Sequence, residues 1–80
     1  MANRIYSLSE VKALAKKFLD IADENNEQVS AYLNGSEKKE AAKAYDLVRE
    51  YERKFINAFN AYYDERFVCC LNYELAESML

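Results

Sequence analysis

Proline is absent from this 80-residue chain, and glycine occurs once, at Gly35. These two residue types are the strongest breakers of regular structure, so long stretches of the chain contain nothing that would end a helix. Half of the residues are hydrophobic (51%), which is too many for a disordered chain. Turn-forming residues are too few for a β-sandwich or barrel. The sequence therefore predicts an all-α protein.

Apolar residues recur at steps of three and four along most of the chain, the spacing of amphipathic helices. We expect a single domain over residues 1–80 with three or four helices, packed antiparallel around one long central helix. The pattern predicts helices over residues 8–24, 27–33, 37–64 and 66–79. Whether residues 64–66 separate two helices or lie within one is left open by the pattern.

Helix boundaries are also encoded locally. Ser7 followed three residues later by Glu10 is the pattern of a capping box, in which each residue hydrogen-bonds the backbone of the other. Asn34 and Gly35 together predict a left-handed stop after the second helix. Ser36 is then placed to cap the long third helix.

The length of the predicted central helix bears on oligomeric state. A helix over residues 37–64 would be about 42 Å long at about 1.5 Å per residue. A compact domain of this size is only about 30 Å across. The helix must therefore bend, break near Asn57 or Asn60, or project and be covered by another chain. Because its apolar stripe becomes aromatic toward its C-terminal end, we predict a homodimer.

Composition argues against several functions. The chain has no histidine, the usual general base near neutral pH, and Cys69 and Cys70 lie side by side in an apolar run. We interpret both cysteines as packing residues and expect no enzymatic activity, no cofactor and no metal site. The net charge of −3 disfavours general nucleic-acid binding. The longest uncharged run is far shorter than a membrane span, and the N-terminus does not resemble a signal peptide, so we expect a cytoplasmic protein without membrane contact.

Tyrosine is unusually frequent, with seven residues. Its side chain combines a large contact area with a polar tip, and it is enriched at protein interfaces. We predict a partner-binding surface on the long helix, with the alternative that these rings form the edge of the core. The candidate residues are Tyr45, Tyr51, Tyr62 and Tyr63.

Acidic residues cluster near the end of the first helix, where negative charge opposes the helix dipole. One interpretation is a docking patch for a basic partner; the others are a solvated face or pairing with lysines at the start of the third helix. The acidic residues are Asp20, Asp23, Glu24 and Glu27, and the lysines are Lys38, Lys39 and Lys43.

A nucleic-acid face is the competing interpretation of the basic residues. The short helix 27–33 and the segment 37–43 could form a helix-turn-helix, with arginines farther along contacting phosphates. The acidic residues Asp46, Glu50 and Glu52 interleave with these basic residues, which is typical of an ordinary solvated helix surface. The candidate residues are Lys38, Lys39, Lys43, Arg49 and Arg53.

Taken together, these features predict a non-enzymatic protein–protein interaction module: a small acidic inhibitor or adaptor whose partner has a basic surface. Small acidic proteins of this type occur in phages and mobile elements, where anti-defence inhibitors such as anti-CRISPR proteins are an example; this is an analogy of class. The alternatives are a small helix-turn-helix-like DNA-binding regulator and a structural oligomerisation module.

Overall fold

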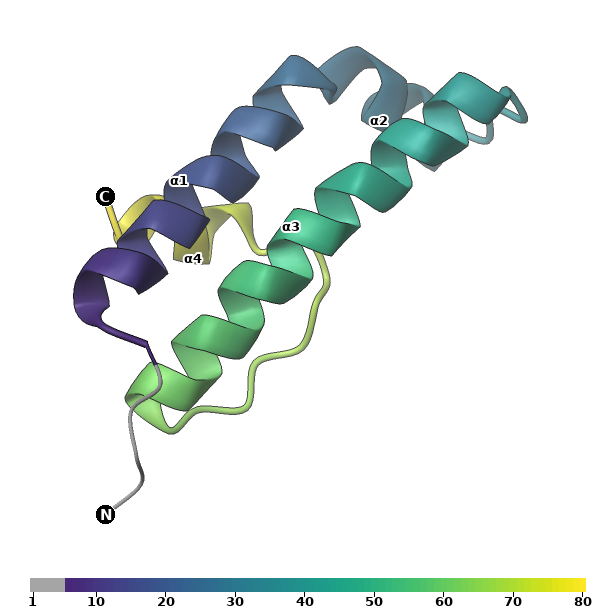
Figure 1. Cartoon of the computed structure of the whole chain (residues 1–80). Coiled ribbons are helices and arrows are strands. Elements are labelled where there is room, and N and C mark those ends of the chain that lie inside the picture. Colours follow the sequence, from purple (N-terminus) through teal and green to yellow (C-terminus); the bar gives the residue numbers. More distant parts are fainter. Residues whose placement is uncertain (1–5) are drawn as a thin grey trace.

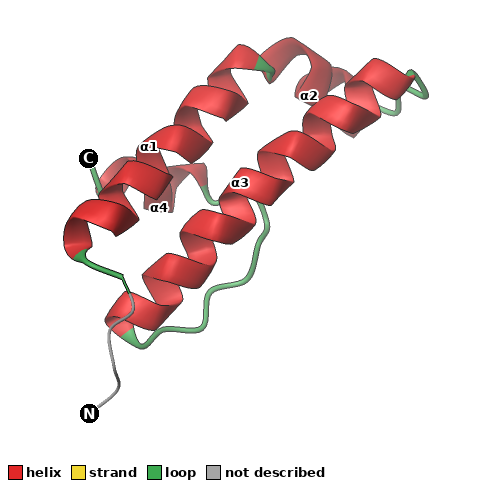
Figure 2. Ribbon diagram, in the orientation of Figure 1, coloured by secondary structure: helices red, strands yellow, loops and turns green. Residues whose placement is uncertain are grey.

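Four helices form the structure, a computed structural model that describes residues 6–80 (Figure 1). They are α1 (Leu8–Glu24), α2 (Asn26–Leu33), α3 (Lys39–Tyr63) and α4 (Tyr73–Ser78). Within residues 6–80 there is no strand (Figure 2), so the prediction of an all-α fold with one long helix is confirmed.

The long helix α3 runs antiparallel to α1, and α2 continues beyond α1 along the N-terminal half of α3 (Figure 1). At about 1.5 Å per residue, the 25 residues of α3 span about 37 Å. The helix neither breaks at Asn57 nor at Asn60, and the fold is elongated, with principal extents of 46 × 20 × 17 Å. Because α1 and α2 lie end to end beside it, α3 does not need a second chain to cover its length.

The core is an aromatic stack between three helices. The ring of Phe18 on α1 lies between Phe55 on α3 and Tyr73 on α4, with centroid distances of 6.1 and 5.4 Å and interplanar angles of 16°. Phe18 and Phe55 are completely buried, as are Val11 and Val48 on the same two helices. This stack fixes the position of the short helix α4 against the rest of the fold.

Two of the predicted boundaries are confirmed in atomic detail. Ser7 Oγ accepts from the Glu10 N–H at 3.2 Å, and Glu10 Oε1 accepts from the Ser7 N–H at 3.4 Å, completing the capping box. At the end of α2, Gly35 has φ +96° and the Ser36 N–H donates to the Ala31 carbonyl at 2.9 Å. This is the bond pattern of a Schellman stop, and its left-handed position favours glycine.

The start of α3 differs from the prediction. The helix begins at Lys39, and its N-cap is Lys38, which supplies no side-chain hydrogen bond. Ser36 does not cap the helix, because its Oγ instead accepts from the Lys38 N–H at 3.3 Å and so shapes the preceding turn. The first turn of α3 therefore begins with lysines where the helix dipole favours acceptors and negative charge.

Replacing Lys38 with aspartate is expected to stabilise the protein by about 1 kcal/mol. Lys38 already has the extended backbone of an N-cap (φ −68°, ψ 139°), so the new carboxylate can accept from the Ala41 N–H. In a domain of this size that gain raises Tm by about 4–8 °C. Thermal unfolding followed by circular dichroism measures it, with Lys38→Ala as the control that removes the charge without adding an acceptor. A Tm for K38D no higher than that of K38A would contradict the prediction.

The C-terminal region also departs from prediction. The helix expected over residues 66–79 is confined to Tyr73–Ser78, and α3 ends at Tyr63 because Asp64 adopts a left-handed conformation (φ 56°). Residues 64–72, here called the strap, leave the end of α3 and run back beside it without helical structure (Figure 1). Asn60 holds the strap through both ends of its amide: Oδ1 accepts from the Phe67 N–H at 3.0 Å and Nδ2 donates to the Phe67 carbonyl at 2.8 Å.

Because the strap is not helical, its apolar residues do not share the buried stripe that a helix would give them. Val68 is 70% exposed and Cys70 is exposed, while Cys69 is half-buried. The interpretation of both cysteines as buried packing residues is therefore corrected for Cys70.

Candidate functional site

An ion pair between two residues of α3, Arg49 and Glu52, holds the strap through hydrogen bonds. Glu52 is completely buried, and its Oε2 accepts from the Asn72 backbone N–H at 2.7 Å and from Asn72 Nδ2 at 2.9 Å. Its Oε1 lies 3.1 Å from Arg49 Nε. Within residues 6–80 neither of these last two atoms has a hydrogen-bond partner, so their contact is a charge pair without hydrogen-bond geometry. We call Arg49, Glu52 and Asn72 the latch.

The remaining nitrogens of Arg49 are also engaged. Nη1 donates to the Tyr45 hydroxyl at 2.6 Å, and Nη2 donates to the Cys69 carbonyl at 2.7 Å. Burial acts to lower the pKa of Arg49, but the hydrogen bond to Tyr45 and the charge of Glu52 outweigh it and raise this pKa above its usual value. Arg49 is therefore a structural cation that fastens the strap, and it is not free to contact a phosphate as the sequence suggested.

The sequence does not identify Glu52 or Asn72 as site residues. It predicts that Glu52 is one of the interleaved charges of a solvated helix surface, which is wrong because Glu52 is completely buried. The signal that could have found it is its spacing: Glu52 lies four residues after Val48 and three before Phe55, on the buried stripe of α3. A carboxylate at such a position needs partners, because an unpaired buried charge is strongly destabilising.

The four predicted tyrosines do not form one surface. Tyr45 stacks on Tyr32 of α2 with a centroid distance of 4.5 Å, and Tyr51 has the ammonium groups of Lys17 and Lys54 over its ring, at 5.7 and 4.8 Å. The rings of Tyr45 and Tyr51 therefore make contacts within the molecule.

Tyr62 and Tyr63 meet edge to face at the end of α3, 4.8 Å apart. Tyr63 and Phe67 both contact the Phe59 ring and are each 44% exposed, next to the exposed Val68. We call the exposed residues Tyr63, Phe67 and Val68 the apolar end.

The acidic residues at the junction of α1 and α2 are all exposed. Asp20 pairs with Lys16 on its own helix, with 3.0 Å between Nζ and Oδ2. Within residues 6–80, none of these acidic residues forms an ion pair with Lys38, Lys39 or Lys43. Glu27 does not oppose a helix dipole, because α2 starts at Asn26 and places Glu27 in its first turn, where negative charge is favourable. The other members of the cluster, Asp23 and Glu24, stand at the same junction.

Part of this cluster borders a shallow hollow between α1 and α4. Leu19, Ala22 and Tyr73 supply apolar surface, and three carboxylates, one of them on α4, form the rim. We call this the acid-rimmed hollow; its lining residues are Leu19, Asp20, Ala22, Asp23, Asn26, Tyr73 and Glu77. Glu24 and Glu27 are not among them and line a neighbouring polar depression at the junction of α1 and α2, which shares Asp23 and Asn26 with the hollow.

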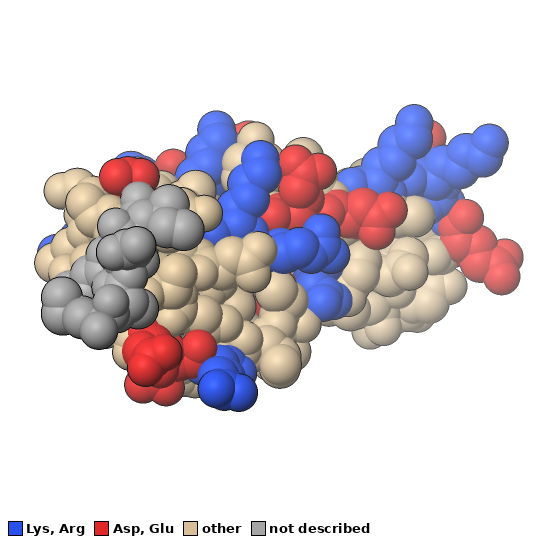
Figure 3. Space-filling view, turned by 60° about the horizontal axis from the view of Figure 1, so that its bottom comes forward, with Lys and Arg blue, Asp and Glu red and all other residues tan. Residues whose placement is uncertain are grey.

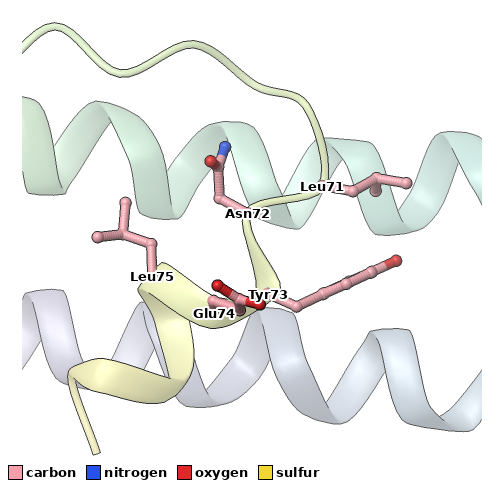
Figure 4. A pocket seen from close by; sticks show the side chains of 5 residues that line it. All are labelled: Leu71, Asn72, Tyr73, Glu74 and Leu75. Atoms are coloured by element: carbon pink, nitrogen blue, oxygen red, sulfur yellow. The ribbon is translucent and has the colours of Figure 1, made fainter.

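A second hollow adjoins it and shares Tyr73. It is formed where the strap enters α4, by residues 71–75 (Figure 4). In Figure 4 the side chain of Asn72 points toward α3, while Tyr73 extends along α1. Tyr73 thus contributes to both hollows while one face of its ring packs on Phe18.

The basic residues do not gather into a single patch. Lys38, Lys39, Lys43 and Arg53 are exposed, but Arg49 is held in the latch. On the face shown in Figure 3, basic and acidic side chains are interspersed. The arrangement is that of a mixed charged surface and not of a continuous basic stripe.

The chain was compared with protein-family models, with curated proteins and with solved structures. None of them matches it. Across residues 6–80, no helix has the length and apolar character needed to cross a membrane. The same residues contain no group of three or more Cys, Asp or Glu side chains arranged to hold a metal ion. Two exposed surfaces, the acid-rimmed hollow and the apolar end, are therefore the structural basis for inferring a function.

The two cysteines are expected to differ in reactivity. Burial, and then the charge of Glu52, raise the pKa of the Cys69 thiol above its usual 9.0, and the thiolate is the reactive form. Two single-cysteine variants separate the thiols: Cys69→Ser retains only the exposed Cys70, and Cys70→Ser retains only Cys69. At pH about 8, iodoacetamide should modify the thiol of Cys69→Ser several-fold faster than that of Cys70→Ser. Mass spectrometry against time measures both rates, and denaturant should make them equal. Equal rates in the folded protein would contradict this assignment.

Proposed function

We propose that this protein acts by binding another protein, without catalysing a reaction, and that the partner presents a basic segment to the acid-rimmed hollow. The observation that carries the proposal is the combination of apolar and acidic lining: half-buried Tyr73 and two half-buried aliphatic residues line the hollow together with exposed Asp23 and Glu77. Protein interfaces typically pair an apolar, aromatic centre with a polar rim. The negative rim complements a positively charged partner, which favours both encounter rate and specificity.

The chemistry of the other side chains supports binding over catalysis. Glu52, the one buried carboxylate among the described residues, is occupied by Asn72 and Arg49. The thiol of Cys69 is held in its less reactive form by burial. Both cysteines are free thiols, which is consistent with a protein that functions in the reducing cytoplasm. We further propose an inhibitor or adaptor role, by analogy with small acidic proteins of phages and mobile elements.

Charge reversal at the rim tests the proposal. The probe is a fluorescent peptide of alternating arginine and leucine, and the readout is anisotropy at about 50 and about 200 mM salt. Asp23→Lys should weaken binding at the lower salt by at least about tenfold, since like charges at an interface cost several kcal/mol. Glu50→Lys is the matched control, because Glu50 is an exposed acid of α3 outside the hollow and makes the same change in net charge.

Equal affinity of D23K and the wild type, or equal weakening by E50K, would overturn the proposal. A duplex DNA probe distinguishes the competing regulator function. DNA binding that falls steeply with salt and is lost on replacing Lys38 and Lys39 with alanine would favour that function instead.

We also propose that two copies associate through the apolar end. Tyr63, Phe67 and Val68 are exposed apolar residues at one end of α3, and a two-fold axis there would place the same rings of both copies in contact. Light scattering at micromolar concentration should give the mass of two chains of 9.3 kDa each, and Tyr63→Glu should reduce it to one. A wild-type mass of one chain would contradict the dimer.

A further inference from the structure

We propose that Glu52 is a positioning residue for the acid-rimmed hollow: through Asn72 it fixes where Tyr73 lies. This inference rests on the proposed function of the hollow. Glu52 is on α3 and is not among the residues that line the hollow. Its carboxylate nevertheless holds both the backbone N–H and the side-chain amide of Asn72, the residue immediately before Tyr73.

The backbone between the latch and Tyr73 is a tight turn. The Tyr73 N–H donates to the Leu71 carbonyl at 2.9 Å across Asn72, whose φ of −78° and ψ of 59° are those of an inverse γ-turn. Leu71 has φ 61°, a left-handed conformation that branched L-residues avoid. Such a conformation persists only where surrounding contacts over-determine it.

The side chain of Asn72 provides those contacts. Its Nδ2 donates to Glu52 Oε2 at 2.9 Å and to the Val68 carbonyl at 2.7 Å, so both of its amide hydrogens are used. One hydrogen therefore ties the turn to α3, and the other closes the strap on itself. Without the Glu52 carboxylate, the turn would lose its hydrogen bonds to α3; among the described residues, Glu52 is the only α3 residue that hydrogen-bonds residues 71–73.

The ring of Tyr73 also packs against the core. It stacks on the completely buried Phe18 at 5.4 Å. Burial, and then the charge of Glu52, raise the pKa of Tyr73, which agrees with a carboxylate close to the ring. The ring is thus fixed between a core contact and an anchored turn before any partner arrives, and such preorganisation increases affinity by lowering the entropy lost on binding.

The test compares two asparagines that fasten the same strap. Asn72→Ala removes the side-chain bonds beside the hollow, whereas Asn60→Ala removes the bonds to Phe67 at the other end of the strap. With the arginine–leucine peptide as probe, N72A should weaken binding by about fivefold or more and N60A should leave it unchanged. Circular dichroism and thermal unfolding establish that each variant is folded.

Salt dependence separates positioning from direct contact. N72A should weaken binding by the same factor at about 50 and about 200 mM salt, because the rim charges remain, whereas D23K should act mainly at the lower salt. Glu52→Leu removes the acceptor of both Asn72 bonds and should weaken binding in the same salt-independent way. The N72A/E52L double variant should bind no more weakly than whichever single variant has the lower affinity, because both act through one contact.

The outcomes are distinguishable. If the wild type does not bind the peptide, the proposed function fails. If the wild type binds and D23K does not, but folded N72A and E52L bind as the wild type does, the function stands and the positioning role of Glu52 is overturned. Equal weakening by N60A and N72A would also overturn it, because general loosening of the strap would then account for the loss.

Discussion

Replacing Phe18 with alanine is expected to lower the free energy of unfolding by about 3–5 kcal/mol. Phe18 is completely buried and is the middle ring of the stack that joins α1, α3 and α4, so its removal deletes contacts to Phe55 and Tyr73 together. The total free energy of unfolding of a native protein is only about 5–15 kcal/mol. Loss of this one ring therefore removes a large fraction of the stability.

Urea denaturation followed by circular dichroism measures the effect. Leu33→Ala is the matched control, because Leu33 is also a large helical residue but is 58% exposed, and its truncation should cost less than about 0.5 kcal/mol. If F18A and L33A lower the unfolding free energy by similar amounts, the aromatic stack is not the centre of the core.

Replacing Glu52 with alanine is expected to lower the free energy of unfolding by about 3 kcal/mol. The substitution leaves the Asn72 N–H groups without their acceptor and Arg49 without its counter-charge, in a region closed to water at Glu52. The figure is at the lower end of values for broken buried pairs because the Arg49 side chain is 27% exposed and its charge stays partly hydrated.

The control for this substitution is Glu50→Ala, two residues earlier on the same helix. Glu50 pairs with Lys54 at 3.6 Å with both side chains more than half exposed, and such pairs contribute less than about 1 kcal/mol. Chemical denaturation of both variants gives the comparison. A loss for E52A no larger than that for E50A would show that the latch does not stabilise the fold.

Much of the helical framework follows from local sequence. The capping box at Ser7, the stop at Gly35 and the three-four spacing of α1 each involve residues within one or two turns of one another. Interactions of that range depend on neighbours in the chain, so they can be recognised without knowing the fold. The all-α class and the bounds of α1 were predicted for this reason.

The strap could not be predicted in the same way. Its apolar run has the spacing of a helix, and nothing within it forbids one. Its conformation is held by Asn60 at a separation of 7 residues and by Arg49 and Glu52 at a separation of 20. Side chains of α3 satisfy backbone groups of the strap that a helix would otherwise pair, and such bonds exist only once the two segments lie together.

The sequence by itself determined the all-α class, the bounds of α1 and the stop at the end of α2, because capping, glycine stops and apolar spacing act between near neighbours. Only the tertiary structure decided that Glu52 is buried and paired, and that Tyr73 and Glu77 of α4 meet Asp20 and Asp23 of α1 around one hollow. The physical reason is distance along the chain: a side chain's partners, and therefore the meaning of its charge, are set by packing between segments that the local pattern does not relate.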